Sequence, residues 1–474
     1  LYRQTAGTTL TIGTGITVSG SGTGTAYLGY YADDAIDFRG VLNASVTGKT
    51  WYLGNVTNTG NINVGAGTLH FDTASGTGTW SNTAVVGKGI SVSGSGVLNL
   101  GDTFTTTGIG RITRSGGSIH VTGVLDNTGQ TLDIGATGPF GAGGLTSLTG
   151  TVTNGTIVSG DGTLLNTPSG TLDGVTIGSN LGFTGGYAYI YNHLLLANGI
   201  TVNKGSAEWY FRSGGTQNLA MVSGTATINN AGGGTYAGYG VAGQTLQIGA
   251  GVTFQGYGTL SDSTPATIVN NGTLIGNTAG QTLTVSPTNF TNNGTLRVTA
   301  GTLTVTPTNW TNSATGSIQA QGGTLTLNGT SLGNSGALSL STGTVFNLGG
   351  TVTVASLGSF TRAAGSTVNL TGTLNLGGGT LDIGSAGAFG TGGLSSLTGT
   401  LVNGTIVSND GTLLNSSNGS LDGITIGSNL GFGGSSTNFY NHLLLANGIT
   451  VDKNSNAWYF RTTGTQNLTT VSGT

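Results

Sequence analysis

The side chains that could perform acid–base or metal chemistry are few and widely spaced in this chain. The sequence holds 15 acidic residues, four His and no Cys. Enzymes that cleave polysaccharides need two carboxyl groups about 5–10 Å apart. Most acids here occur singly along the sequence: Asp126, Asp133, Asp161, Asp173, Asp262, Asp382, Asp410 and Asp422. Asp161 and Asp173 are 12 positions apart, about half of the repeat length described below, so we expect them on different faces of the fold.

Zinc chemistry is equally unsupported by the spacing of the histidines. His193 and His442 lie 249 positions apart and occupy equivalent places in two copies of one sequence. A zinc site needs three or four His, Cys or carboxylate ligands that converge on one point. We therefore predict no catalytic residue, no metal ligand, no cofactor-binding residue and no enzymatic activity.

A short acidic and aromatic stretch, residues 27–39, interrupts the pattern of the surrounding sequence. Asp33, Asp34 and Asp37 lie within it. Calcium takes six or more oxygen ligands, usually from a loop with a Gly turn, and this spacing matches no such loop. We interpret residues 27–39 as a solvated loop inserted between coils, with a cation site as the less favoured alternative.

Two aromatic segments, 186–212 and 435–461, hold the candidate binding residues. Aromatic faces can stack on sugar rings, and Arg offers forked hydrogen-bond donors. The candidate docking patch comprises Tyr191, His193, Trp209, Tyr210, Arg212, Tyr440, His442, Trp458, Tyr459 and Arg461. In the favoured alternative, the order Trp-Tyr-Phe-Arg is a strand that buries Trp and Phe inside a wide coil.

The elements that position these residues follow a repeat of 20–22 residues. Between residues 270 and 376, one set of apolar residues follows a Gly and a second set closes each Thr-Leu-Thr-Val-like run. The first set is Leu274, Leu296, Ile318, Leu338 and Phe360, and the second is Val285, Val305, Leu327, Leu348 and Leu370. Short alternating runs at constant spacing predict a parallel β-solenoid with Leu and Val inside and Thr outside. Asn270 and Asn292, which are 22 positions apart, are placed to form a ladder of side-chain amides.

The composition agrees with this architecture and excludes several others. The chain of 474 residues has 93 Gly, 35% hydrophobic residues and only 6% charged residues. Ordinary globular domains have about 25% charged residues, and disordered chains lack periodic aliphatic residues. The net charge of −3 gives no basis for nucleic-acid binding, and the sequence predicts no membrane insertion.

The chain contains two copies of one long unit. Residues 131–225 align without a gap to residues 380–474, and 68 of the 95 pairs are identical. We predict a first repeat unit at 1–236, which includes the insertion at 27–39, and a second at 237–474. Residues 2–12 and 466–474 are expected to be ordinary coil, so we expect the solenoid to continue past both ends.

The runs Asn289-Phe290-Thr291-Asn292-Asn293-Gly294-Thr295-Leu296 and Gly322-Gly323-Thr324-Leu325-Thr326-Leu327-Asn328-Gly329 resemble those of a family of bacterial surface proteins. These proteins have autotransporter-type β-strand repeats and include passenger domains and filamentous-haemagglutinin-like adhesins. The resemblance covers nearly the whole chain. It implies an exported, elongated, right-handed β-helix at the bacterial cell surface.

Several functions are compatible with such a fold. The first expectation is an extracellular structural fibre or stalk whose partner is the same chain, either continued or stacked end to end. The alternative is an adhesin that binds surface glycans through the aromatic segments. Ice binding is less favoured, because the outward rows at Thr282, Thr302 and Thr324 give way to Val345 in the next coil. A polysaccharide-active enzyme is the least favoured.

Overall fold

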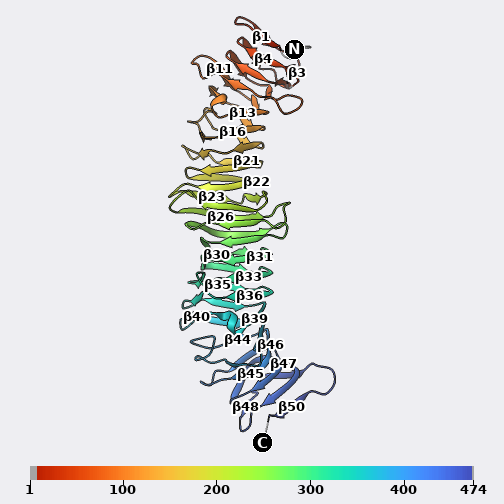
Figure 1. The fold of residues 1–474 in the computed structure, drawn as a ribbon, viewed down its shortest axis with the longest axis vertical. Helices are drawn as coiled ribbons and strands as arrows, with labels where there is room; N and C mark the ends of the chain where they lie inside the picture. The colour runs from red at the N-terminus through yellow and green to blue at the C-terminus, as the bar shows by residue number, and fades with distance from the viewer. Residues whose placement is uncertain (1–7, 32, 472–474) are drawn as a thin grey trace. The chain divides into compact units, whose positions relative to one another are not determined.

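The computed structural model describes residues 8–31 and 33–471 of the chain. They form an all-β parallel solenoid of about 21 turns, with about 22 residues per turn (Figure 1). The helical residues in this described part are two 3-10 turns, η1 (Thr107–Ile109) and η2 (Val354–Leu357). The predicted fold class and coil length are confirmed. The coil segments predicted at residues 2–7 and 472–474 lie outside the described residues.

The contacts divide the chain into two compact units, Leu1–Gly234 and Thr235–Thr474. The strands of the first unit are β1 (Thr9–Ile12), β2 (Thr17–Ser19), β3 (Gly24–Leu28), β4 (Ala35–Phe38), β5 (Val41–Ala44), β6 (Lys49–Leu53), β7 (Val56–Asn58), β8 (Asn61–Val64), β9 (Thr68–Phe71), β10 (Ser81–Asn82), β11 (Gly89–Val92), β12 (Val97–Leu100), β13 (Thr103–Thr105), β14 (Ile112–Arg114), β15 (Ser118–Val121), β16 (Val124–Asp126), β17 (Thr131–Asp133), β18 (Ser147–Leu148), β19 (Thr151–Thr153), β20 (Thr156–Val158), β21 (Leu165–Ile177), β22 (Leu181–Leu196), β23 (Thr201–Gly205), β24 (Glu208–Phe211) and β25 (Thr216–Met221). The next strand, β26 (Ala226–Ala237), includes the boundary between the units.

The first coils of this unit have three faces, and each coil contributes one strand to each face. The first face is β1, β4, β7 and β10, the second face is β2, β5, β8, β11 and β14, and the third face is β3, β6, β9, β12, β15 and β18. Neighbouring strands on a face pair in parallel, as Leu42 does with Ile62 and Ile62 with Ile90. Alternate residues therefore point into one continuous interior, since successive side chains of a strand point to opposite sides.

The coils of the second unit, taken by itself, also have three faces, which we number by their order within a coil as in the first unit. Its remaining strands are β27 (Thr245–Ile248), β28 (Val252–Asp262), β29 (Thr267–Asn270), β30 (Thr273–Val285), β31 (Asn289–Asn292), β32 (Thr295–Val305), β33 (Asn309–Asn312), β34 (Ser317–Ala320), β35 (Thr324–Leu327), β36 (Ser331–Asn334), β37 (Ala337–Leu340), β38 (Val345–Leu348), β39 (Thr351–Thr353), β40 (Ser359–Arg362), β41 (Thr367–Leu370), β42 (Thr373–Asn375), β43 (Thr380–Asp382), β44 (Ser396–Leu397), β45 (Thr400–Val407), β46 (Leu414–Ile426), β47 (Leu430–Leu445), β48 (Val451–Asp452), β49 (Ala457–Phe460) and β50 (Asn467–Thr470). Long strands such as β30 and β32 bend around a corner, so that Leu274 lies on the second face and Val285 on the third.

Both predicted columns of apolar residues are present in the second unit. Consecutive members of each column are strand partners, from Leu274 to Phe360 and from Val285 to Leu370. Every member is buried except Phe360, which is half-buried. The outward Thr rows are also in register, with Thr284, Thr304 and Thr326 as successive partners.

A ladder of buried Asn side chains marks the corner between the first and second faces. In the second unit it runs through Asn270, Asn292, Asn312 and Asn334, and successive amide-to-oxygen distances are 2.7, 2.6 and 2.7 Å. The ladder predicted at Asn270 and Asn292 is therefore confirmed. The first unit has a shorter version in which Asn58 donates to Asn82 across 2.8 Å.

One prediction about the first unit is wrong. Residues 27–39 are not an inserted loop, because β3 includes Tyr27 and Leu28 and β4 comprises Ala35–Phe38. Ile36 and Phe38 are buried and pair with Leu10 and Ile12 of β1. The sequence predicted a loop here because the stretch is acidic. The apolar residues of β4 nevertheless alternate in the same way as those of β1.

Candidate functional site

The predicted docking patch is divided between the interior and the surface. Trp209 is fully buried and lies edge-on to Phe183, with ring centroids 5.4 Å apart. In β24, Trp209 and Phe211 point inward while Glu208 and Tyr210 point outward. The assignment of Trp209 to a docking surface is therefore wrong, because strand alternation places it in the core. The alternative interpretation, with Trp and Phe packed inside, is confirmed for this strand.

Trp458, the equivalent residue in the second unit, also contributes to internal packing. It is half-buried, and its ring lies 5.0 Å from that of Phe432 and 4.9 Å from that of Phe439. Its indole N–H is a buried donor without an acceptor within the described residues. Trp209 therefore offers no free face to a ligand, and the two rings that contact Trp458 belong to the core.

The tyrosines and arginines of the patch lie on the outer surface of the coil. The guanidinium carbon of Arg212 lies 4.5 Å from the ring centre of Tyr189 and 5.9 Å from that of Tyr191. Tyr187 meets Tyr189 edge-on at 5.5 Å, and the hydroxyl of Tyr210 donates to the carboxylate of Glu208 on the same strand. This arrangement, which we call the tyrosine surface, presents aromatic edges, phenol groups and one cation.

The second unit has a reduced version of this surface. Tyr440, Tyr459 and Arg461 are retained, and the guanidinium carbon of Arg461 lies 4.8 Å from the ring centre of Tyr459. Ser436 and Asn438 stand at the positions of Tyr187 and Tyr189. His193 and His442 are half-buried strand residues in their respective units. The two units thus differ at two outward positions of the tyrosine surface.

The structure brings together acids that the sequence analysis treated as isolated. Asp133 and Asp161 both border Gly135, where an added Cβ would lie 3.1 Å from an oxygen of Asp133 and 2.4 Å from one of Asp161. The two acids are 28 positions apart, one coil length plus a Gly-rich insertion. Asp382 and Asp410 occupy the equivalent positions in the second unit. Recognising the insertion would have revealed both pairs.

These acid pairs stabilise a turn and are poorly suited to acid catalysis. Hydrogen bonds to its carboxylate lower the pKa of Asp161 to about 2. The bond from the backbone N–H of Ala136 has the largest effect, and the bonds from Thr163 have the next largest. Burial alone would raise the pKa of Asp133, but hydrogen bonds from Thr137, Gly135 and Gly160 outweigh it and lower the pKa. Both carboxyls are therefore ionised at neutral pH, whereas a glycosidase needs one protonated acid.

The acid pairs belong to a loop module that occurs once in each unit. Residues 135–144 and 384–393 form the two Gly-rich loops, anchored by the fully buried Phe140 and Phe389. Arg114 holds the first loop, and its guanidinium donates to the carbonyls of Gly144 and Gly117, each across 2.6 Å. Arg362 holds the second through the carbonyl of Gly393. The guanidinium groups are thus occupied by backbone carbonyls.

Asp72 and Asp102 form a different acid pair in the first unit. Burial raises the pKa of each carboxyl, and the two are hydrogen-bond neighbours. Asp102 also accepts from the backbone N–H of Thr73 at 2.9 Å and from its hydroxyl at 3.1 Å. Because Asp102 is only 4% exposed, a substrate would have little access to it.

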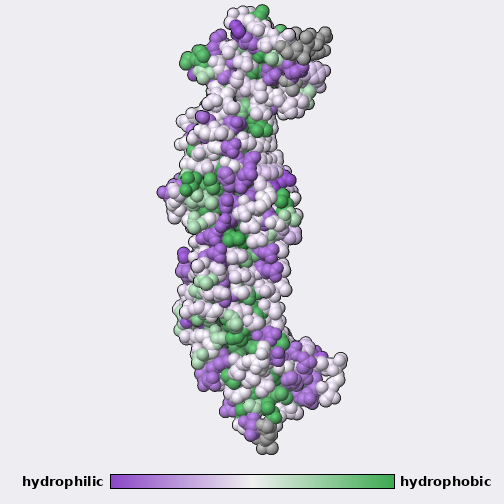
Figure 2. Space-filling model, in the orientation of Figure 1, coloured by the Kyte–Doolittle hydropathy of each residue, from purple (hydrophilic) through white to green (hydrophobic). Residues whose placement is uncertain are grey.

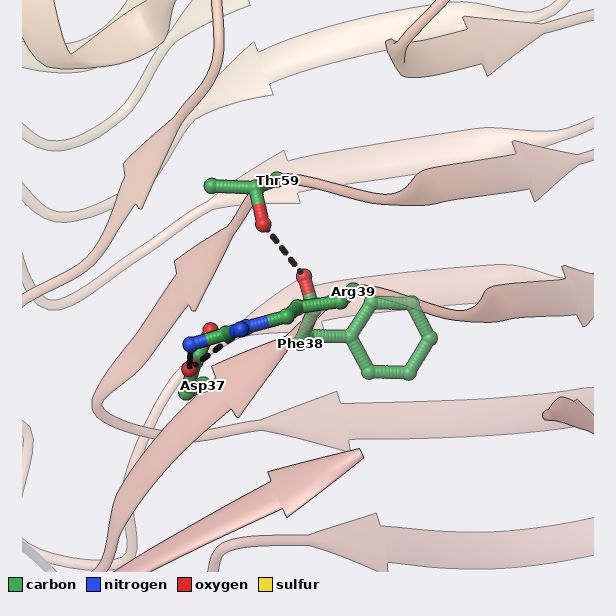
Figure 3. Close-up of polar contacts among 4 residues, drawn as sticks. All are labelled: Asp37, Phe38, Arg39 and Thr59. Atoms are coloured by element: carbon green, nitrogen blue, oxygen red, sulfur yellow. Dashed lines mark hydrogen bonds and ion pairs between the residues drawn. The ribbon is translucent and has the colours of Figure 1, made fainter. Parts of the chain in front are cut away.

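The acids of the stretch 27–39 are engaged in local contacts. Asp34 is buried and accepts from the backbone N–H groups of Tyr30 and Tyr31 at 2.9 and 3.2 Å. Asp37 forms an ion pair with Arg39 on the surface, with a shortest distance of 2.5 Å (Figure 3). Within residues 8–31 and 33–471, no group of three or more His, Cys, Asp or Glu side chains is placed to hold a metal ion.

The outward row of the third face also differs between the units. In the first unit, successive strand partners are Tyr27, Tyr52, His70, Asn99, His120 and Ser147. Tyr52 and His70 stack with ring centroids 4.6 Å apart, so the row exposes ring edges and covers ring faces. In the second unit the partners at the end of this row are Asn347, Asn369 and Ser396.

None of the helical turns in the described part of the chain is long or apolar enough to cross a bilayer. No protein-family model matches the chain, and a search of curated proteins finds no match to its sequence.

Proposed function

We propose that this chain is a section of an extracellular structural fibre or stalk. The observation that carries the proposal is the continuous strand pairing of one apolar column in the second unit, from Leu274 to Phe360. Each coil there is joined to its neighbours by parallel strand pairing on three faces, by an apolar column and by a buried amide ladder. Stability in a solenoid is approximately the sum of such nearest-neighbour interfaces, so repeated units extend its length without a new core.

The proposal also includes a surface location and self-association. The resemblance to β-strand-repeat surface proteins supports an exported bacterial protein, and the duplicated 95-residue segment supports growth by addition of units. In this proposal, the coil partners of the fibre are further units of the same kind, within one polypeptide or between copies.

Electron microscopy of intact source cells tests this function directly. Antibodies against the chain, labelled with gold, should decorate fibres or stalks outside the cell, and protease added to intact cells should remove the label. Negatively stained native material should show filaments of uniform width. Label confined to the cell interior would refute the proposed location, and isolated compact particles in native material would refute the fibre.

Glycan adhesion is a second candidate function, and the tyrosine surface of the first unit favours it. Tyr187 is 38% exposed, and Arg212 lies over Tyr189. The substitutions Tyr187→Ser and Tyr189→Asn introduce the residues of the second unit at these positions. On a glycan array, wild-type binding that this double variant loses would support adhesion, while binding retained by the variant would exclude the tyrosine surface as its site.

A further inference from the structure

A polar groove lies on the second face of the first unit. It has a volume of about 270 Å³, and its lining residues are Asn61, Asn63, Gly87, Lys88, Gly89, Ile90, Ser91, Arg111 and Thr113. The lining comes from three consecutive strands, β8, β11 and β14, and from the segments that precede β11 and β14. Typical pockets for drug-sized ligands have about 300–1,000 Å³, so this groove suits a smaller group such as one sugar ring.

One glycine of the lining lets two successive coils approach each other closely. Gly89 is the strand partner of Asn61 and begins β11 with a φ of 113°. A Cβ added there would lie 2.4 Å from the carbonyl oxygen of Arg111, which is too close for any side chain. The middle strand therefore contributes only backbone at this point, between the side chains of Asn61 and Arg111.

One wall of the groove is a row of hydrogen-bonding side chains. Ser91 donates to the side-chain oxygen of Asn63 across 2.8 Å, and Asn63 donates to Asn43 across 2.9 Å. Thr113 continues the row as the strand partner of Ser91. Hydroxyl and amide groups are both donors and acceptors, so they can pair with sugar hydroxyls.

The groove also carries two cations, Lys88 and Arg111. Both are exposed, and neither has a hydrogen-bond or ion-pair partner on its charged group within the described residues. The chain has only 12 basic residues and a net charge of −3. The groove is therefore locally positive, although the molecule as a whole carries a net negative charge.

The equivalent place in the second unit keeps a polar row, Gln319, Ser339 and Thr361, but lacks the glycine and both cations. The strand partners Leu338 and Phe360 correspond to Ile90 and Ile112, because in both units a 3-10 turn and a Gly with positive φ precede the latter residue. Gly336, Ala337 and Ser359 then stand at the positions of Lys88, Gly89 and Arg111.

The first unit also has a longer connection in front of the groove. Six residues separate Asn82 from Gly89, whereas two separate Asn334 from Ala337. The extra residues include Val85 and Val86, which are 61% and 81% exposed. Figure 2 shows a hydrophobic projection at the upper left, on the side where Figure 1 labels β11. The insertion thus adds an exposed apolar edge beside the cations.

We propose that this groove binds an acidic polysaccharide, with Lys88 and Arg111 contacting its carboxylate or sulfate groups. The row at Asn63 and Ser91 would pair with ring hydroxyls, and Val85 and Val86 would cover the apolar face of a sugar ring. A linear chain along the solenoid axis would meet a new strand every ~4.8 Å. Nucleic acid fits less well, because no aromatic side chain lines the groove to stack on bases. This site is independent of the structural function proposed above.

Binding to immobilised polymers tests the proposal, with the full chain as the analyte. The probes are polygalacturonate, dextran sulfate, neutral dextran and single-stranded DNA. Lys88→Gly with Arg111→Ser converts both positions to the residues of the second unit. A control variant, Arg39→Ser with Lys453→Gly, removes the same charge elsewhere. Circular dichroism confirms that each variant is folded.

The expected result is binding to one or both acidic polysaccharides, which the groove variant weakens by about tenfold or more and the control leaves unchanged. The choice between polygalacturonate and dextran sulfate identifies the acidic group. Equal binding to neutral dextran, stronger binding to single-stranded DNA, equal losses in the two variants, or no binding to either acidic polymer would each overturn the proposal.

Discussion

The side-chain amide of Asn292 donates to Oδ1 of Asn312 across 2.6 Å, and both side chains are fully buried. Asn292 accepts in turn from Asn270, and Asn312 donates to Asn334, so the two inner amides are both donors and acceptors within the ladder. The ladder ends where Asn334 donates to the carbonyl of Leu357, the last residue of η2. Any shift in coil register would leave several buried polar groups unpaired, which makes the ladder a register lock.

Removing one member of the ladder should destabilise the coils on both sides. Asn292→Leu would leave the donor of Asn270 and the acceptor of Asn312 without their main partner, at a cost of about 2–4 kcal/mol. Asn309→Ala removes an exposed amide bond of 3.2 Å to Asn289 and should cost less than about 0.5 kcal/mol. Hydrogen exchange of β31 and β33 measures both effects, and similar protection in the two variants would contradict the role of the ladder.

Inward and outward positions of two paired strands, β32 and β35, should respond differently to substitution. Leu327 is 2% exposed, so Leu327→Asp places an unpaired charge in the column and should cost about 3–5 kcal/mol. Thr304 points outward from β32, and Thr304→Ser should change stability by less than about 0.5 kcal/mol. Urea unfolding followed by circular dichroism compares them, and equal midpoints would refute the assigned facing.

The regular coils were predictable from sequence because each residue type has one place in them. Leu and Val recur at constant spacing, Thr alternates with them, and Asn270 and Asn292 mark one corner. The prediction failed where charge conflicted with alternation, as at Ile36 and Phe38, which are buried in β4 despite their acidic neighbours.

The candidate sites were harder to predict, because they depend on insertions that change the spacing between coils. The Gly-rich loop lengthens one coil and so brings Asp133 close to Asp161. A search at the constant coil length would therefore miss this pair. The groove includes Lys88, which belongs to an insertion, and its contrast with the second unit around Ala337 becomes visible only once the strands are aligned by structure. Trp209 was correctly anticipated as a core residue by alternation alone.

Arg114 should be required for the order of the first Gly-rich loop. Its guanidinium holds the carbonyl of Gly144, and Arg114→Met would remove those bonds while it preserves much of the packing. Amide exchange across residues 135–144 should rise, while residues 384–393, held by Arg362, keep their protection. The substitution Arg362→Met should give the reverse pattern. Exchange that rises equally in both loops would show global unfolding and refute the local role.

Lys204 should make the first unit more stable as the pH rises above neutrality. Burial lowers the pKa of Lys204 to about 7, and its ammonium donates to Oδ1 of Asn230 across 3.0 Å. The unfolded chain, with a Lys pKa near ~10.4, binds more protons between about pH 7 and 10, so the free energy of unfolding rises with pH there. Urea titrations at pH 7, 8 and 9 should show this slope, and Lys204→Met should reduce it. Lys453→Met, at the exposed equivalent position, is the control and should leave the slope unchanged.

His120 should make the first unit sensitive to mild acid in a way the second unit is not. Burial is the main reason that the pKa of His120 is below its usual 6.5, and the positive charge of Arg114 lowers it further. Its ring nitrogens contact the hydroxyls of Ser147 at 2.5 Å and Ser118 at 2.9 Å, and Asn99 is its neighbour in the row. The unfolded chain takes up a proton first, so the stabilisation is complete above about pH 6.5 and declines as the pH falls below it.

His120→Asn introduces the residue that the second unit has at Asn369. Hydrogen exchange of β15 and β18, corrected for the intrinsic effect of pH, should lose protection between pH 7 and 5 in the wild type and less in this variant. His70 has its pKa lowered by burial as well and supplies the remaining dependence. Identical pH profiles for the wild type and His120→Asn would show that the pKa of this imidazole is the same in the folded and the unfolded chain, and would contradict the prediction.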